Sequence, residues 1–255
     1  MSRPQRAFRT PCVIVKRRDF GEADRILTIL TPYHGKIDVV AKGARKLTSH
    51  KTGHVELFTR VDMLIHRGRD LGIAVQVELV EPYLRLREDL KRGAYANYAA
   101  ELLDRFTLTD DDDASELYRL FDVTLARLCS EGDPLLAVRY FEMHLLEQVG
   151  FRPEITDCAI GHEPILPEDQ FFSYAAGGVI CSRHAAQASG AFPISMTALK
   201  LLRHIQRSPF EAIQALRVPE AIHAEADRIM IGYITFLLER RLQSIEFIRR
   251  LRFTH

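Results

Sequence analysis

The 255-residue sequence is 47% hydrophobic and 27% charged, values typical of a chain that folds around a sizeable core. No apolar stretch approaches the roughly 20 residues that span a bilayer, and the basic N-terminus lacks the apolar segment of a signal peptide. We therefore expect a cytoplasmic protein without membrane contact. The net charge of +1 hides an asymmetry: residues 1–80 hold 15 Lys and Arg against 8 Asp and Glu, and the remainder holds 20 against 26. A basic first third favours an anionic partner such as nucleic acid, although a solvated surface would have the same composition.

Five short β-strands are predicted in the first third of the chain, with no long helix between them. Their apolar runs cover residues 12–15, 26–30, 37–41, 55–66 and 73–80. Pro32 and Gly35 mark a turn that joins the second and third runs into a hairpin, and a basic loop follows from Lys42 to Gly53. Five strands in about 80 residues fit a small closed barrel of the OB type. An SH3-like barrel would have the same number of strands.

From Pro82 onward the apolar spacing is helical. Helices are predicted over residues 84–106, 114–129, 134–149, 195–206, 209–215 and 219–250. Between them, residues 151–190 contain three Pro and four Gly and form a loop-rich insert. The sequence thus predicts an α+β protein with a barrel domain, 1–81, and a helical domain, 82–255, that contains the 151–190 insert.

Ten basic residues lie at strand ends and in loops of the predicted barrel, where they can converge on one groove. Cationic surfaces of this kind bind phosphates with little sequence preference and with an affinity that falls as salt rises. The candidates for DNA contacts are Lys16, Arg17, Arg18, Arg25, Lys36, Lys42, Arg45, Lys46, Arg67 and Arg69. The candidate surfaces for stacking bases are Phe20, Tyr33 and Phe58, with burial in the core as the alternative for each of them.

The insert contains two pairs of residues with the spacing of metal ligands. The four candidates are Cys158, His162, Cys181 and His184. Zinc takes four N or S ligands tetrahedrally, and ligands a few residues apart can be presented to one ion by a tight turn. The alternative is an insert without metal that is held by packing of its larger side chains, namely Phe171, Phe172, Tyr174 and Ile180.

No catalytic motif stands out. The sequence lacks a Gly-x-Ser-x-Gly elbow, a Walker phosphate loop, a dinucleotide-binding fingerprint and a His-Glu-x-x-His zinc helix. We therefore predict that the protein is not an enzyme. Two rival interpretations are a scaffold whose basic barrel binds RNA or an acidic protein, and a zinc-dependent hydrolase.

Short motifs in a fixed order along the chain carry a family resemblance. They are Gly21-Glu22-x-Asp24-Arg25, Leu30-Thr31-Pro32-x-x-Gly35-Lys36, Lys42-Gly43-Ala44-Arg45, Glu78-Leu79-Val80-Glu81, Val149-Gly150-Phe151-x-Pro153 and Gly177-Gly178-Val179-x-Cys181. On these motifs the chain resembles the bacterial RecO family of recombination mediators. The resemblance implies an N-terminal OB barrel followed by a helical domain with a zinc-finger-like insert, and it favours the OB over the SH3-like barrel.

The resemblance also implies a function in DNA repair and recombination at the nucleoid. Proteins of this family bind single- and double-stranded DNA, anneal complementary strands, and act with RecR to load RecA onto DNA coated by single-strand-binding protein. RecR and single-strand-binding protein are therefore the expected direct partners, and RecA an indirect one. We expect the acidic C-terminal tail of single-strand-binding protein to dock near Arg240 and Arg241. No cofactor is required for this activity.

The chain departs from the family at the metal ligands. Zinc-bearing members have two Cys-x-x-Cys pairs, whereas here Gly161 and His184 follow Cys158 and Cys181 at the second positions. Because glycine has no ligand atom, a structural zinc ion in this insert requires His162 as a substitute.

Overall fold

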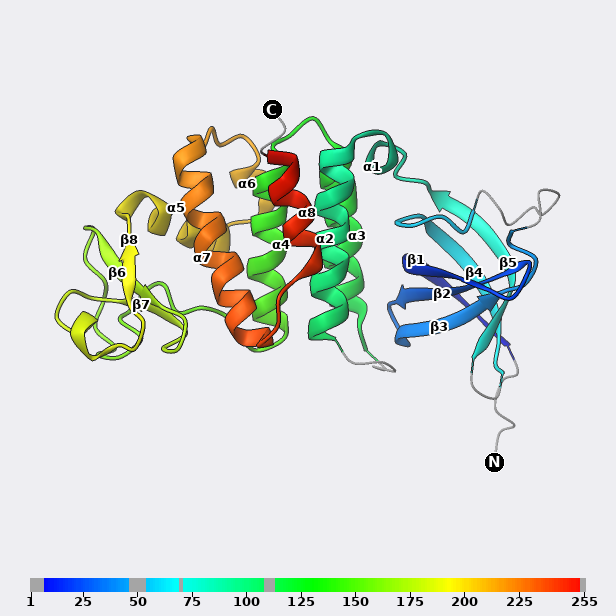
Figure 1. Cartoon of the computed structure of the whole chain (residues 1–255), viewed down its shortest axis with the longest axis horizontal. Coiled ribbons are helices and arrows are strands. Elements are labelled where there is room, and N and C mark those ends of the chain that lie inside the picture. The colour runs from blue at the N-terminus through cyan, green and yellow to red at the C-terminus, as the bar shows by residue number, and fades with distance from the viewer. Residues whose placement is uncertain (1–6, 46–53, 69–70, 108–112, 253–255) are drawn as a thin grey trace. The chain divides into compact units, whose positions relative to one another are not determined.

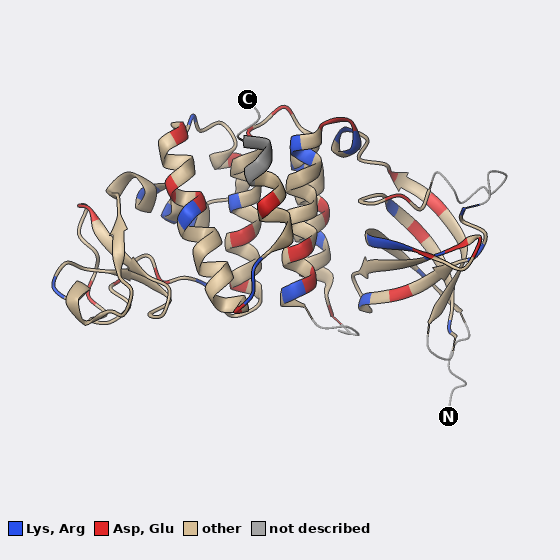
Figure 2. Ribbon diagram, viewed as in Figure 1, with Lys and Arg blue, Asp and Glu red and all other residues tan. Residues whose placement is uncertain are grey.

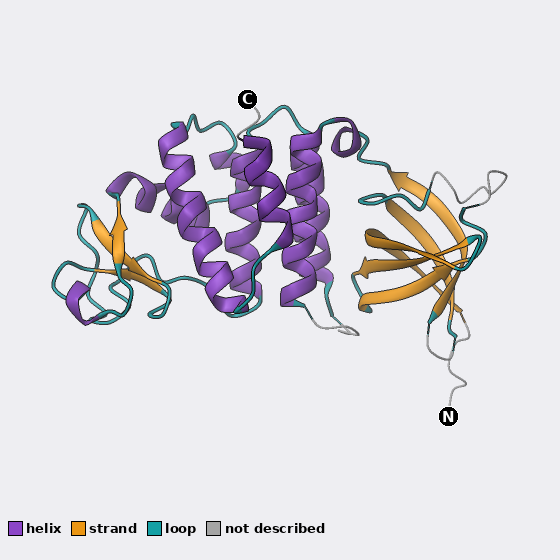
Figure 3. Ribbon diagram, viewed as in Figure 1, coloured by secondary structure: helices purple, strands orange, loops and turns teal. Residues whose placement is uncertain are grey.

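The computed structural model describes residues 7–45, 54–68, 71–107 and 113–252. The chain forms two compact units, Met1–Ser130 and Glu131–His255. In the described ranges, the first contains the barrel strands and helices, and the second contains a small sheet and further helices (Figure 1; Figure 3). Within the described residues, no helix is long and apolar enough to cross a membrane.

The first unit begins with a closed five-stranded barrel. Its strands are β1 (Ala7–Phe20), β2 (Asp24–Thr31), β3 (Gly35–Ala41), β4 (Arg60–His66) and β5 (Gly72–Glu81). They close in the order β1-β2-β3-β5-β4, and only β3 and β5 pair in parallel. The predicted OB-type barrel is thus confirmed.

β1 is much longer than the predicted 12–15 strand. Its first half pairs with β4, from Ala7 opposite His66 onward, and its second half pairs with β2, up to Phe20 opposite Asp24. The register shifts between Ile14 and Lys16, as at a β-bulge, which bends a strand. One strand therefore serves both neighbours, and its basic second half does not show the apolar alternation on which the prediction relied.

Among its described residues, the first unit also contains the helices α1 (Arg85–Glu88), α2 (Leu90–Phe106) and α3 (Ser115–Cys129). The single helix predicted over 84–106 is interrupted at Asp89, whose backbone is extended and whose side chain accepts hydrogen bonds from the backbone N–H groups of Lys91 and Arg92. Asp89 is therefore the N-cap of α2, because a short acidic side chain satisfies the free N–H groups of a helix start better than a further helical residue would.

Lys36, predicted as a DNA contact, lies at the junction between the barrel and α2. Its side chain is only 8% exposed and pairs with Asp104 Oδ1 at 2.9 Å. Its Nζ also donates to the backbone oxygens of Asp104, at 3.0 Å, and Thr107, at 3.2 Å, at the C-terminal end of α2. Burial raises the pKa of Asp104, but the hydrogen bonds from Lys16 and Lys36 outweigh it, so the pKa is lowered. The contacts of Lys36 are thus structural, and its burial leaves little of its side chain on the surface where a DNA contact was predicted.

The second unit contains α4 (Pro134–Gln148), α5 (Met196–Arg207), α6 (Phe210–Ile213), α7 (Glu220–Leu238) and α8 (Gln243–Arg252). The prediction of one helix over 219–250 is wrong. The chain leaves α7 at Glu239, whose φ of 51° is left-handed, and then turns so that Leu242 and Ile245 are buried. No Gly or Pro marks this break, so the sequence carried no signal for it.

The insert and the three residues Phe192–Ile194 that follow it form a small antiparallel sheet in the order β7-β6-β8. Its strands are β6 (Gln170–Ser173), β7 (Gly178–Ile180) and β8 (Phe192–Ile194), and the insert also contains a 3₁₀ helix, η1 (Ala185–Gln187). Strands of three or four residues are too short to show alternation, so the sequence predicted only loops. Tyr174 joins the insert to α7: its Oη donates to the carbonyl of Arg228 at 3.3 Å.

Gly232 on α7 provides the space for this contact. A Cβ there would lie 2.0 Å from Tyr174 Oη and 2.4 Å from Tyr174 Cζ. We expect Gly232→Ala to lower the melting temperature, although alanine favours a helix by about 1 kcal/mol over glycine. In a Tyr174→Ala background the same change should raise the melting temperature, because only the helix propensity remains. Thermal unfolding of wild type, the two single variants and the double variant measures the sign of the change in each background. A destabilisation by Gly232→Ala that persists without Tyr174 would contradict the steric explanation.

Candidate nucleic-acid interface and metal centre

The strand register divides the basic residues of β1 into two groups. Leu27 and Ile29 of β2 belong to the barrel core. Lys16 and Arg18 lie opposite Thr28 and Ile26, at the alternate positions, so they face outward. Arg17 lies opposite Leu27, so its side chain extends from the face of the sheet that carries Leu27. Acidic and basic positions occur close together along the barrel strands (Figure 2).

Three of the predicted DNA contacts form what we term the arginine cluster: Arg17, Arg25 and Arg45 with the carboxylates of Asp19 and Glu56. Arg17 pairs with Glu56 Oε2, and Arg25 Nη1 lies 3.2 Å from Glu56 Oε1. Asp19 in turn lies 3.5 Å from Arg25 Nε and 3.5 Å from Arg45 Nε. Cations and anions therefore alternate along the cluster.

The loop after β3 is held in place by the turn between β1 and β2. The Asp24 side chain accepts a hydrogen bond from Gly43 N at 2.8 Å, and the Ala23 carbonyl accepts one from Arg45 N at 2.9 Å. Gly43 has a φ of 68°, in the left-handed region that glycine adopts readily. The Gly-Glu-Ala-Asp-Arg and Lys-Gly-Ala-Arg motifs thus bind each other and position Arg45 at the cluster.

The outward positions carry the more accessible cations. Arg18 pairs with Asp38 at 3.1 Å with its side chain 66% exposed. Lys42 is exposed and forms no ion pair with any residue in the described ranges. Lys16 pairs with Asp104 while remaining half exposed. Phe20, one of the predicted stacking residues, is 50% exposed at the end of β1.

The remaining predicted contacts are placed differently. Phe58 is 3% exposed in the core, so its predicted role in stacking on bases is wrong. Tyr33 is 64% exposed in the β2–β3 turn. The Arg67 guanidinium lies 5.4 Å from the centre of the Phe8 ring, an aromatic residue that the sequence analysis did not consider. Lys46 and Arg69 lie outside the residues that the structure describes.

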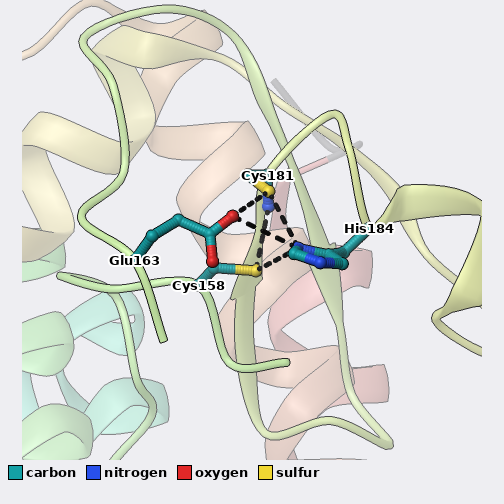
Figure 4. A group of neighbouring side chains, drawn as sticks. All are labelled: Cys158, Glu163, Cys181 and His184. Carbon is teal, nitrogen blue, oxygen red and sulfur yellow. Dashed lines mark hydrogen bonds and ion pairs between the residues drawn. The ribbon is translucent and has the colours of Figure 1, made fainter. Parts of the chain in front are cut away.

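Four side chains of the insert form a candidate metal centre: Cys158, Glu163, Cys181 and His184. Their ligand atoms all lie within 4.8 Å of one another, and they point toward a common centre (Figure 4). His184 Nδ1 is 3.6 Å from Cys158 Sγ and 3.2 Å from Cys181 Sγ. Glu163 Oε1 is 3.0 Å from Cys181 Sγ and 3.3 Å from His184 Nδ1.

Three of the four predicted metal ligands are thus brought together, and the fourth member is Glu163 instead of His162. His162 is exposed in a turn with a φ of 58°, where its N–H donates to the Cys158 carbonyl at 2.8 Å. A Cβ on Gly161 would lie 2.0 Å from Glu163 Oε2 and 2.7 Å from His184 Nδ1. The missing side chain at position 161 therefore leaves the space into which the carboxylate of Glu163 extends, so a glycine two residues before a carboxylate was the signal in the sequence for this fourth member.

The two thiols have different electrostatic environments. Burial opposes ionisation of Cys158, but backbone N–H groups of Cys181, Gly161 and Ile160 overcome it and lower its pKa to about 7. Burial and the neighbouring Glu163 carboxylate raise the pKa of Cys181. The pKa of Glu163 is lowered by the hydrogen bond from Cys181. Two thiols, an imidazole and a carboxylate are ligands that zinc accepts, so the residues fit this ion.

Two family models match the chain in succession. The model described as recombination protein O N terminal matches residues 5–83, and that described as recombination protein O C terminal matches residues 87–246. An OB-type barrel followed by helices, with both of these matches, defines the chain as a protein of DNA repair and recombination.

Curated relatives are similar in sequence to this chain over nearly its full length. A DNA repair protein RecO of Roseiflexus sp. is 39% identical over 246 residues, which cover 95% of this chain and 85% of that protein. A protein of the same name from Symbiobacterium thermophilum is 35% identical, and the match covers 94% of this chain and 96% of that protein. A third, from Dehalococcoides mccartyi, is 34% identical and covers 93% of each chain. The chain belongs to the RecO family.

Proposed function

We propose that this chain is a recombination mediator that binds single- and double-stranded DNA, anneals complementary strands and, with RecR, helps to load RecA onto DNA coated by single-strand-binding protein. The observation that carries the proposal is the exposure on the barrel of two cations, Arg18 and Lys42, and of the ring of Phe20. Cations on such a surface reduce the repulsion between two strands, and base pairing supplies the free energy of annealing. The proposed activity therefore needs no catalytic residue.

The test is annealing of complementary labelled oligonucleotides by wild type and by an Arg18→Gln/Lys42→Gln variant. We expect the variant to bind single strands roughly tenfold more weakly at 0.1 M salt, because two phosphate contacts are lost. The slope of log affinity against log salt should become shallower by about 1.4, at about 0.7 per phosphate contact. Fluorescence anisotropy measures both quantities. Tighter binding to RNA or to an acidic protein than to DNA would contradict the mediator function and favour a scaffold.

A matched control carries the same charge change at Arg240 and Arg241, which are exposed after α7. We propose that these two residues receive the acidic C-terminal tail of single-strand-binding protein. Arg240→Gln/Arg241→Gln should therefore anneal bare DNA normally and lose affinity for a peptide of that tail. The opposite pattern is expected for the barrel variant, so the two chains separate DNA binding from partner binding.

We further propose that Cys158, Glu163, Cys181 and His184 hold a structural zinc ion. The support is the convergence of four ligand atoms and the space that Gly161 leaves for the Glu163 carboxylate. With four protein ligands the ion would cross-link the insert and have no open position for chemistry. Metal analysis should find about one zinc per chain in wild type and in a Glu168→Gln control, whose carboxylate is outside the group, and less in Glu163→Gln.

A further inference from the structure

The arginine cluster contains three cations, and each has a carboxylate beside it. The guanidinium groups come from three separate segments: β1 contributes Arg17, β2 contributes Arg25, and the loop after β3 contributes Arg45. Glu56 lies between Arg17 and Arg25, and Asp19 lies between Arg25 and Arg45. The fold therefore assembles a small surface of positive charge and supplies its own negative charges in the same place.

The ion pairs at the Asp19 end of the cluster are accessible and their distances are long. The Asp19 side chain is 60% exposed and that of Arg45 is 38% exposed, and exposed pairs contribute only about 0–1 kcal/mol each. Nε of Arg25 is buried and donates no hydrogen bond, with the Asp19 carboxylate 3.5 Å away. Guanidinium groups bind carboxylate and phosphate with the same planar arrangement of donors. A phosphate can thus replace the Asp19 carboxylate at little cost in ion-pair energy.

Of the two carboxylates in the cluster, Glu56 lies closer to its guanidinium groups and is the more buried. It touches two guanidinium groups, and its side chain is 24% exposed. It precedes β4, and its segment is fastened to β1 by hydrogen bonds from Phe58 N to the Ile14 carbonyl at 2.8 Å and from Ile14 N to the Thr59 carbonyl at 3.2 Å. The carboxylate of Glu56 is consequently kept next to Arg17 and Arg25 by backbone contacts that do not depend on the ion pairs.

We propose that the arginine cluster is a binding site for successive phosphates of a nucleic-acid backbone, and that Glu56 and Asp19 are resident counter-ions which the phosphates displace. This inference rests on the proposed DNA binding. Glu56 then sets how tightly the barrel binds DNA: its carboxylate lowers the affinity by occupying Arg17 and Arg25 whenever DNA is absent. Removing that charge strengthens binding, a direction opposite to that expected for a residue that contacts DNA favourably.

The test compares Glu56→Gln with Glu22→Gln in binding a labelled single-stranded oligonucleotide. Glu22 is exposed in the turn beside the cluster and forms no ion pair with any residue of the described segments, so it controls for the loss of one negative charge. We expect Glu56→Gln to bind about fivefold more tightly at 0.1 M salt, with a salt slope steeper by up to about 1.4 for two released cations. Glu22→Gln should change the affinity less than twofold. Equal effects of the two substitutions would overturn the inference.

A second comparison assigns the effect to the two arginines. In an Arg17→Gln/Arg25→Gln background, Glu56→Gln should give no gain in affinity, and a gain that persists would overturn the inference. Thermal unfolding verifies that all chains are folded. If wild type binds no DNA, the proposed mediator function fails, but binding by Glu56→Gln under the same conditions would still support displaceable counter-ions. If neither chain binds, both proposals are overturned.

Discussion

Cys181→Ser is expected to leave the chain without bound zinc and to lower the stability of the insert by about 5 kcal/mol, since structural zinc sites contribute roughly 10–16 kcal/mol in isolated zinc-finger peptides. The smaller figure reflects the packing that the insert has without metal: the buried Phe172 ring contacts Tyr233 of α7 at a centroid distance of 5.9 Å. Thermal unfolding with and without a chelator measures the effect. The chelator should destabilise wild type and leave the variant unchanged.

Cys129→Ser is the matched control, because Cys129 is a partly buried thiol at the end of α3 in the first unit. It should retain zinc and respond to the chelator as wild type does. A wild-type chain that contains no zinc and does not respond to the chelator would show that the aromatic packing alone holds the insert. Limited proteolysis locates the change, because cleavage should begin within residues 151–190.

Lys36→Met is expected to destabilise the first unit by about 3–5 kcal/mol, the usual cost of removing one partner of a buried ion pair. Methionine fills much of the same space but leaves Asp104 with one cationic partner, Lys16. It also removes the donor for the backbone oxygens of Asp104 and Thr107. Urea unfolding measures the loss.

Lys16→Met removes the other partner of the same carboxylate and is the control. Because Lys16 is 52% exposed, we expect a loss within about 1 kcal/mol. The pKa of Asp104 is lowered in the folded chain, so its pairing stabilises above the unfolded pKa of about 3.9 and is lost as the pH falls through the folded pKa. The difference between wild type and Lys36→Met should therefore shrink in acid. Equal losses for the two lysines at neutral pH would contradict the buried role of Lys36.

The strands of the barrel could be predicted from the sequence because their information is local, whereas the choice of the OB arrangement came from the family resemblance. Alternation in residues such as Leu27 and Ile29, together with the Pro32 and Gly35 turn, gives strand pairing without any knowledge of distant contacts. The burial of Lys36 and its pairing with Asp104 could not be predicted in this way. Its partner Asp104 is 68 residues away, and nothing near Lys36 in the sequence distinguishes a buried ammonium group from an exposed one.

One member of the candidate metal centre also could not be predicted, although it lies close in sequence to the other ligands. Residue type and spacing identified Cys158, Cys181 and His184, since pairs of thiols and imidazoles a few residues apart recur at zinc sites. The same spacing predicted His162, one residue after Gly161, as the fourth ligand and did not point to Glu163. The choice depends on which way a turn directs each side chain, and the left-handed backbone of His162 cannot be read from residue types.

The double pairing of β1 determines when the barrel can be completed during synthesis. Residues 14–20 find their partners in β2, which follows directly, so a hairpin can form as soon as both have left the ribosome. Residues 7–13 pair with β4, residues 60–66, and β4 in turn needs β5. The start of β1 therefore remains without its partner until about fifty more residues have been translated, and contacts of such long sequence separation form slowly. The barrel cannot close until residue 81, the end of β5, has left the ribosome. Until then, the unfinished chain exposes a hydrophobic edge that the finished protein covers.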